Sequence, residues 1–234
     1  MSPPTNTKTF LMSGTTRGIG RGLVSSLLQH PNTTVIAGVR GTKAATATSL
    51  NFLPKAQGAN LIIKDHGIQQ LDVVIANAGV IGDEGISKVG DVTAEAIRAD
   101  FEVNALGPLY LFQATLPLLE KSPDAKFAVT TSAIGSTTLA PTFGVPTAAY
   151  GVSKAAVNHL FRKASGEYPN IGFVIIHPGL VQTDIGGLFA EQAKRAIPSI
   201  TVEESVKGYL EVIGKGREEL GAKFWNYDGS ELPW

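Results

Sequence analysis

The fold is decided by the stretch Lys8-Thr9-Phe10-Leu11-Met12-Ser13-Gly14-Thr15-Thr16-Arg17-Gly18-Ile19-Gly20. Its first five residues predict a short buried strand. Residues Arg21 to His30 predict a helix, because apolar residues recur on one side and Pro31 follows. A Gly-x-x-x-Gly-x-Gly turn between a strand and a helix suits a dinucleotide, since glycines let the backbone approach the pyrophosphate and the helix N-terminus offers free N–H groups. The alternative is an ordinary glycine-rich turn.

The end of the second strand indicates which dinucleotide binds. Thr33 to Val39 predicts this strand, and folds that bind NAD place an acidic residue at its end. Here Val39 occupies that place, Arg40 follows it, and Arg17 lies inside the glycine turn. Two guanidinium groups without a carboxylate suit the 2′-phosphate of NADP(H). The alternatives are two merely exposed arginines and, less favoured, an NAD-linked alcohol oxidation.

The rest of the chain continues to alternate strands and helices, as an α/β domain does. Helices are predicted at Thr42–Leu53, at Thr93–Glu120 with two interrupting prolines, from Tyr150 to about Gly166, and after a capping box at Thr201–Glu204. Further strands are predicted at Ala59–Lys64, Leu71–Ile75, Lys126–Thr131, Phe173–Ile176 and Lys223–Tyr227. No linker or repeat interrupts the order, so residues 1–234 are expected to form one doubly wound Rossmann-type domain.

Tyr150 and Lys154 form a candidate proton-transfer pair. They are four residues apart, so in a helix both side chains lie on one face, one turn apart. A lysine ammonium beside a phenol favours the phenolate and lowers the pKa of the phenol, which makes the pair a proton donor and acceptor near neutral pH. Taken alone, this spacing is more often that of a solvated helix face.

The composition excludes several other classes of protein. The apolar share is 43% and the charged share 17%, which is typical of a globular chain. Basic and acidic residues both number 20, so neither nucleic acid nor an anionic membrane is an expected partner. Cysteine is absent, which excludes disulfides and thiolate catalysis and fits a cytoplasmic location. The N-terminus does not resemble a signal peptide, and no apolar run is long enough for a membrane span. The four histidines are scattered without the spacing of metal ligands, so no metal site is expected.

Six motifs in one order give the chain a specific resemblance. They are Gly14-x-x-x-Gly18-x-Gly20, Asn77-Ala78-Gly79, Asn104, Ser132, Tyr150-x-x-x-Lys154, and Pro178-Gly179 with Thr183. From end to end the chain resembles the short-chain dehydrogenase/reductase family. Within it, the chain is most similar to fungal ketoreductases of the norsolorinic acid type and to C-factor and sniffer-like carbonyl reductases.

The resemblance implies catalytic roles for four residues. Tyr150 would give a proton to a carbonyl oxygen that Ser132 hydrogen-bonds and orients. Lys154 would lower the pKa of Tyr150 and hold the nicotinamide ribose, and Asn104 would hold a water that links Lys154 to solvent. The implied reaction is reduction of a ketone by NADPH, and a homodimer or homotetramer is the assembly typical of the family.

The resemblance also implies the residues that contact the cofactor. Asp65 resembles the aspartate that contacts adenine in the family, and Asn77 would support the central strand near the adenosine. The remaining expected contacts come from the glycine turn, the second strand end and the last motif: Gly14, Thr16, Arg17, Gly18, Ile19, Gly20, Arg40, Ala78, Gly79, Asn104, Tyr150, Lys154, Pro178, Gly179, Val181 and Thr183.

One departure from the family concerns the spacing of Ser132. It lies eighteen positions before Tyr150, whereas about a dozen is more usual in the family. Thr137 or Thr138 would fit the usual spacing. Ser132 is kept as the expected residue because it directly follows a strand, and Ser136 to Thr147 is then an insertion in a loop beside the substrate.

The second departure is the connection from the third to the fourth strand. The family's sheet is parallel with order 3-2-1-4-5-6-7, and a helix links strands three and four. Here only Asp65 to Gln70 separates them. The link must span about 22 Å, and six residues reach at most about 22 Å. Three explanations compete: a displaced or lost third strand, a segment absent from this sequence, which is favoured, and a partner surface that covers the gap.

Two functional hypotheses from different classes follow. The first is an NADPH-dependent ketoreductase acting on a hydrophobic, for example aromatic or polyketide, ketone. The second is a dinucleotide-binding regulator or impaired paralogue, suggested by the missing crossover helix. The intact set of Ser132, Tyr150 and Lys154 favours the first.

Overall fold

The computed structural model describes residues 7–63, 67–192 and 198–234. Its centre is one twisted sheet with strand order β3-β2-β1-β4-β5-β6-β7-β8. The neighbouring strands are parallel except β8, which pairs antiparallel with β7. The strands are β1 (Lys8–Met12), β2 (Thr33–Ala37), β3 (Asn60–Ile62), β4 (Val73–Ala76), β5 (Lys126–Thr130), β6 (Gly172–His177), β7 (Phe224–Asn226) and β8 (Glu231–Leu232).

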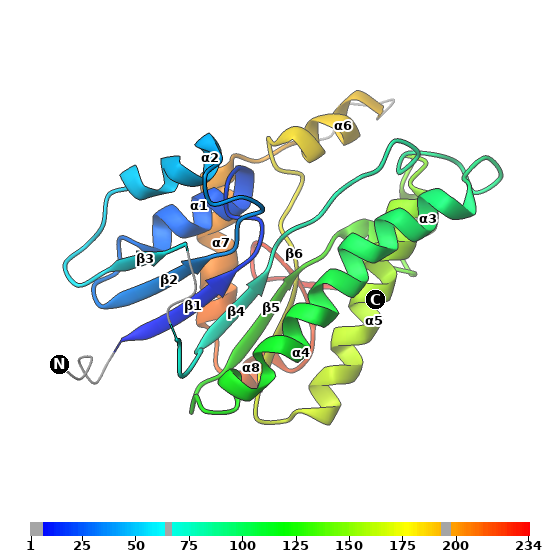
Figure 1. The fold of residues 1–234 in the computed structure, drawn as a ribbon. Coiled ribbons are helices and arrows are strands. Elements are labelled where there is room, and N and C mark those ends of the chain that lie inside the picture. The colour runs from blue at the N-terminus through cyan, green and yellow to red at the C-terminus, as the bar shows by residue number, and fades with distance from the viewer. Residues whose placement is uncertain (1–6, 64–66, 193–197) are drawn as a thin grey trace.

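Helices cover both faces of this sheet (Figure 1). α1 (Gly18–Leu27) and α7 (Val202–Gly214) lie on one face, while α3 (Ala94–Phe101), α4 (Gly107–Leu119) and α5 (Ala148–Glu167) lie on the other. α6 (Asp184–Gln192) lies above the carboxyl ends of the strands. The short helical segments are α2 (Ala45–Thr48), η1 (Ser49–Phe52), η3 (Ala133–Gly135), η4 (Ala140–Thr142) and α8 (Arg217–Leu220).

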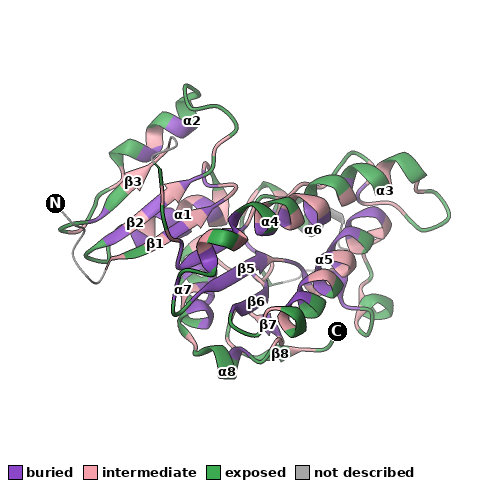
Figure 2. Cartoon of the chain, turned by 60° about the horizontal axis from the view of Figure 1, so that its bottom comes forward, coloured by how far each residue is buried: buried purple, intermediate pink, exposed green. Residues whose placement is uncertain are grey.

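The two faces bury separate apolar clusters. The alternation of a strand sends Met12 and Val35 toward α1 and α7, while Val74 and Phe127 pack toward α4 and α5. Figure 2 shows the central strands as buried, whereas β3 at the edge is partly exposed. The seven-strand order expected from the resemblance is confirmed, and the sheet gains a short antiparallel eighth strand where only a tail was expected.

The long helix predicted at Thr93–Glu120 is divided. α3 begins at the N-cap Thr93, whose side chain accepts the Ala96 N–H, and a π-helical turn, η2 (Glu102–Leu106), joins α3 to α4. Single π turns in helices frequently lie at functional sites, because they change the direction in which side chains point. This turn contains Asn104.

No helix is found between β3 and β4 in the residues that the structure describes there, as the sequence indicated. The third strand is nevertheless in place, since Ile62 lies opposite Ile36 of β2, so the explanation by a displaced strand is wrong. Leu11 and Ile36 on the same face are only partly buried. Ile68 of the connection packs against the cluster on this face. Residues 64–66, which include Asp65, lie outside the described residues.

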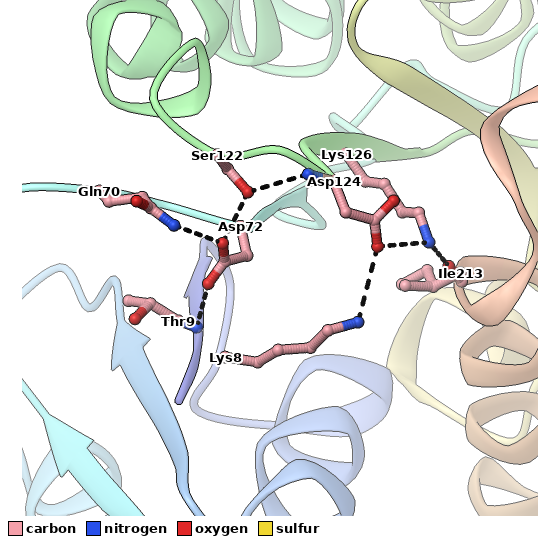
Figure 3. Close-up of polar contacts among 8 residues, drawn as sticks. All are labelled: Lys8, Thr9, Gln70, Asp72, Ser122, Asp124, Lys126 and Ile213. Atoms are coloured by element: carbon pink, nitrogen blue, oxygen red, sulfur yellow. Dashed lines mark hydrogen bonds and ion pairs between the residues drawn. The ribbon is translucent and has the colours of Figure 1, made fainter. Parts of the chain in front are cut away.

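Asp72 fixes the end of this short connection (Figure 3). Its side chain is buried, and Oδ2 accepts the Thr9 N–H at 2.8 Å. Oδ1 accepts the Gln70 amide at 2.9 Å and the Ser122 hydroxyl at 2.6 Å. The carboxyl thus ties the start of β4 to β1 and to the loop before β5.

Asp72→Ala is expected to lower the free energy of unfolding by about 2–4 kcal/mol, because it leaves buried donors without an acceptor. Urea denaturation with an unchanged m-value measures this loss. The exposed Asp91→Ala variant is the control and should differ from wild type by less than about 0.5 kcal/mol. Equal effects of the two substitutions would show that Asp72 does not anchor the connection.

Candidate active site

The glycine turn between β1 and α1 packs tightly against the end of β4. Gly14 has a φ of +69°, and a Cβ there would lie 2.8 Å from the Ala78 Cα. The Ser13 hydroxyl accepts the N–H groups of Asn77 and Ala78, both at 3.1 Å. The turn therefore has no side chain at Gly14 and Gly18, beside the N-terminus of α1, where free N–H groups attract a phosphate.

One cavity of about 910 Å³ begins at this turn and extends across the carboxyl ends of the central strands. Arg17 and Arg40 line it at the end near β2, and both are exposed. Arg17 also forms an exposed ion pair with Asp184 at the start of α6. Arg40 gives the cavity a cation that suits an anionic group, and Arg17 adds a second guanidinium group whose charge Asp184 partly balances.

Ser132, Tyr150 and Lys154 line the same cavity. Helix α5 places Tyr150 and Lys154 one turn apart, with the Lys154 Nζ 5.6 Å from the centre of the Tyr150 ring. The Lys154 ammonium donates to the Thr130 carbonyl at 3.0 Å, and Ser132 lies at the end of β5 as the N-cap of η3. The helix predicted from the spacing of Tyr150 and Lys154 is therefore present, and its pair faces the cavity rather than solvent.

Burial shifts the proton affinities of this pair. It raises the pKa of Tyr150 well above its ordinary value; the charge of Asp100 adds to the rise, and a hydrogen bond with Ser132 opposes it. Burial also lowers the pKa of Lys154 to about 8, against the opposing charge of Asp100. The sequence-based expectation of a lowered Tyr150 pKa is not met, because burial disfavours the charged phenolate and the charge of Asp100 disfavours it further. A neutral phenol is the form that can donate a proton.

Asn104 lies behind the cavity rather than in its lining. Its Oδ1 accepts the Val80 N–H and its Nδ2 donates to the Val80 carbonyl, both at 2.9 Å. Nδ2 also donates to the Ser153 hydroxyl at 3.0 Å. The Asn104 side chain thus hydrogen-bonds both to α5 and to the loop after β4.

The structure brings most of the expected residues together. The cavity lining includes Gly14, Thr16, Arg17, Gly18, Ile19, Gly20, Arg40, Asn77, Ala78, Gly79, Ser132, Tyr150, Lys154, Pro178, Gly179, Val181 and Thr183. Asn104 borders this set, and Asp65 lies outside the described residues. The Thr137 hydroxyl and the Thr138 N–H instead donate to the Trp234 carbonyl, and neither residue is in the cavity lining, whereas Ser132 is.

Sequence reasoning missed the apolar wall beside Tyr150. Ile134, Phe143, Val145 and Phe189 line the cavity there, and the rings of Phe189 and Tyr150 lie 5.4 Å apart. The loop between Ser132 and Tyr150 supplies Ile134, Phe143 and Val145. The only sign of this wall in the sequence is the unusual length of that loop. His177 also lines the cavity; burial lowers its pKa to about 4, which leaves it neutral.

Within the described parts of the chain, no cluster of three acidic or histidine side chains could hold a metal ion. The helices described there are also too short or too polar to cross a membrane.

Comparisons with known proteins agree with this geometry. The short chain dehydrogenase family model matches residues 8–194. The norsolorinic acid ketoreductase nor1 of Dothistroma septosporum is 36% identical over 250 aligned positions, which cover 97% of this chain and 92% of the relative. Among solved structures, the NADPH-bound carbonyl reductase from chicken fatty liver has a TM-score of 0.83 at 28% identity, covering 98% of this chain and 100% of the other. The carbonyl reductase Sniffer of D. melanogaster has 0.80 at 26%, with the same coverage.

The alignment with the Dothistroma protein is longer than the part of this chain that it covers. Because 97% of 234 residues is about 227, roughly 23 of the 250 aligned positions have no residue here. A crossover helix with its two connections has about this length. With a matching family model over most of its length, the same sheet order and the same motifs, the chain belongs to the short-chain dehydrogenase/reductase family, a family of oxidoreductases.

Proposed function

We infer that the protein is an NADPH-dependent ketoreductase that acts on a hydrophobic carbonyl compound, such as an aromatic or polyketide ketone. One observation carries this proposal: a single cavity joins the glycine turn and two arginines to Ser132, Tyr150 and Lys154. The relative called a ketoreductase and the NADPH-bound carbonyl reductase support the same reaction class.

The residues present fit NADPH. The glycine turn and the N-terminus of α1 would hold the pyrophosphate, and Arg17 and Arg40 would hold the 2′-phosphate. Lys154 would hold the nicotinamide ribose. When bound, this cofactor supplies the hydride for carbonyl reduction.

The chain's own residues would then manage the proton and the orientation of the substrate. Tyr150 donates its phenolic proton to the carbonyl oxygen, since burial keeps the phenol neutral near pH 7. Ser132 donates a hydrogen bond to the same oxygen and stabilises the negative charge that develops there. The apolar wall of Ile134, Phe143, Val145 and Phe189 excludes water and binds the substrate skeleton.

A panel of ketones tests the proposal, with loss of NADPH absorbance as the readout. Hydrophobic aromatic ketones should turn over with a higher kcat/KM than small polar ones, because the wall beside Tyr150 is apolar. Tight NADPH binding without turnover of any ketone would instead favour the regulator or impaired paralogue.

Arg40→Ala is expected to raise the KM for NADPH by about 10- to 100-fold, the equivalent of a lost charged hydrogen bond. The KM for NADH should change little, because NADH lacks the 2′-phosphate. Arg98→Ala removes an exposed arginine on α3 and serves as the matched control. An equal loss with both cofactors would contradict a role for Arg40 in binding the 2′-phosphate.

A further inference from the structure

Trp234 packs on the sheet and on helix α5. Its ring is half-buried and stacks on the ring of Phe224 in β7, with the ring centres 5.5 Å apart. The guanidinium group of Arg162 on α5 lies 5.8 Å from the centre of the Trp234 ring. β8 leads into this residue, because Leu232 pairs with Phe224 at the edge of the sheet. Trp234 is therefore held by two elements, and Figure 1 marks this end of the chain beside α5.

The Trp234 carbonyl accepts two hydrogen bonds from the loop between Ser132 and Tyr150. The Thr137 hydroxyl donates at 3.1 Å and the Thr138 N–H donates at 2.9 Å. Among the described residues, the other hydrogen bonds of residues 136–146 stay within the loop. Trp234 is thus the distant residue to which the middle of this loop is tied.

A series of turns connects the two threonines with the apolar wall of the cavity. The Ser136 hydroxyl accepts the Leu139 N–H at 3.1 Å, and the Leu139 carbonyl accepts the Thr142 N–H at 2.8 Å. Phe143, which lines the cavity, follows directly. Because each turn is bonded to the next, the point at which the Trp234 carbonyl holds the loop helps to set the position of Phe143.

The catalytic end of the loop is held separately, by α5. The Asn158 side chain donates to the Gly135 carbonyl at 3.2 Å. A Cβ at Gly135 would lie 2.6 Å from the carbonyl carbon of Lys154, so the backbone there packs directly on the helix. The contact with Trp234 can therefore loosen while Ser132 and Lys154 keep their places.

Covering the core would need only the ring of Trp234. That ring packs against the apolar cluster on this face of the sheet. Thr137 and Thr138 are exposed, so water would satisfy their donors if the loop moved away. Hydrogen bonds that water can replace add little stability, and their main consequence is where the loop lies.

We propose that Trp234 is a positioning residue for the substrate. Its ring is fixed on Phe224, and its carbonyl sets the position of the loop that carries Phe143 and Val145, and thereby the fit of a bulky aromatic carbonyl compound against the apolar wall. The effect on the substrate rests on the proposed function, whereas the anchoring of the loop is a property of the protein alone.

Amide hydrogen exchange followed by NMR tests the anchoring without cofactor or substrate. Thr138 is exposed, so the protection of its N–H depends on the bond to Trp234. In Trp234→Ala the Thr138 amide should exchange at least about tenfold faster, because the loop opens locally. The Asp91 amide, bonded to the Lys88 carbonyl in another exposed turn, should exchange at the wild-type rate. Trp234→Phe can still stack on Phe224 and should restore most of the protection.

Two results of this measurement would overturn the anchoring. One is wild-type protection of Thr138 in Trp234→Ala. The other is an equal acceleration of Thr138 and Asp91, which would show a general loss of stability rather than a local release of the loop.

Steady-state kinetics with a bulky aromatic and a small aliphatic ketone test the effect on the substrate. Trp234→Ala should raise the KM for the aromatic ketone about tenfold, because its contact with the wall is loosened. The kcat, the KM for NADPH and the KM for the small ketone should stay within about two-fold of wild type. Trp234→Phe should restore the KM for the aromatic ketone. Phe52→Ala removes a ring of η1 that is 86% exposed and should match wild type throughout.

Thr137→Val is a second variant that leaves the core untouched. It removes one exposed donor, and the KM for the aromatic ketone should rise by about 2- to 10-fold, the equivalent of one hydrogen bond. An unchanged KM in both Trp234→Ala and Thr137→Val, or a fall in kcat with both ketones alike, would show that Trp234 merely closes the core. If no ketone is reduced, the proposed function fails, and the exchange of Thr138 still decides whether Trp234 anchors the loop.

Discussion

Tyr150→Phe is expected to lower kcat/KM for ketone reduction by about 10²- to 10⁴-fold, because the variant has no phenolic proton to donate. The aromatic ring remains and keeps its contact with Phe189, so the cavity should hold its shape. NADPH affinity should stay within a few-fold of wild type. Steady-state kinetics and titration of NADPH fluorescence measure the two quantities separately.

Tyr110→Phe is the matched control for this substitution. Tyr110 is 54% exposed on α4, so removing its hydroxyl should leave the kinetics unchanged. If Tyr150→Phe turned over ketones at a rate comparable to that of the control, the assignment of Tyr150 as proton donor would be wrong.

Gly20→Ala is expected to weaken NADPH binding by about 100-fold or more, because opening the turn would misplace its backbone N–H groups, and a lost hydrogen bond to a charged group costs about 1.5–3 kcal/mol. A Cβ at this position would lie 2.0 Å from the Gly14 carbonyl oxygen and 2.6 Å from the Asn77 Nδ2. The turn would have to open, and overpacking of this kind also lowers stability by about 1–3 kcal/mol. Isothermal titration with NADPH and urea denaturation measure the two effects.

Gly166→Ala provides the comparison within a regular helix. Gly166 lies in α5, and a Cβ there would meet nothing within 4 Å. This variant should bind NADPH normally and gain about 0.5–1 kcal/mol of stability. Normal binding by Gly20→Ala as well would mean that the turn does not hold the pyrophosphate.

The site is predicted best where spacing along the chain translates directly into position. The glycine turn and the Tyr150–Lys154 pair are local motifs, and a strand or helix fixes where their side chains lie. Parallel strands then bring their carboxyl ends to one edge, which is why Ser132 and Thr183 join the same cavity. These residues could be assigned without knowing which distant segments of the chain contact one another.

Features that depend on packing between distant segments could not be predicted. The π turn around Asn104 breaks a continuous helical pattern, and the unusual burial of Asp100 follows from the loop that covers it. The direction of the Tyr150 pKa shift was wrong for the same reason, since desolvation depends on the whole surrounding core. Phe143 and Phe189 come from a loop and a helix whose approach no local pattern indicates.

The β3–β4 connection lies between these cases. Its shortness was visible in the sequence, and the structure shows β3 in its usual place beside β2. The alignment with the Dothistroma relative leaves roughly 23 positions without a residue here, which is about the length of a crossover helix with its connections. What could not be predicted is the compensation: Asp72 anchors the end of the link, and Ile68 packs onto part of the face that the helix would cover.

Isotope transfer tests the central claim most directly. The protein is incubated with NADPH deuterated at C4 of the nicotinamide and with a hydrophobic aromatic ketone, and the alcohol is analysed by mass spectrometry. We expect one deuterium on the carbinol carbon from one face of the cofactor, and at least about 100-fold less labelled alcohol with Tyr150→Phe over the same time. Bound NADPH with no labelled alcohol from the wild-type protein, for any ketone of the panel, would contradict the assignment as a ketoreductase.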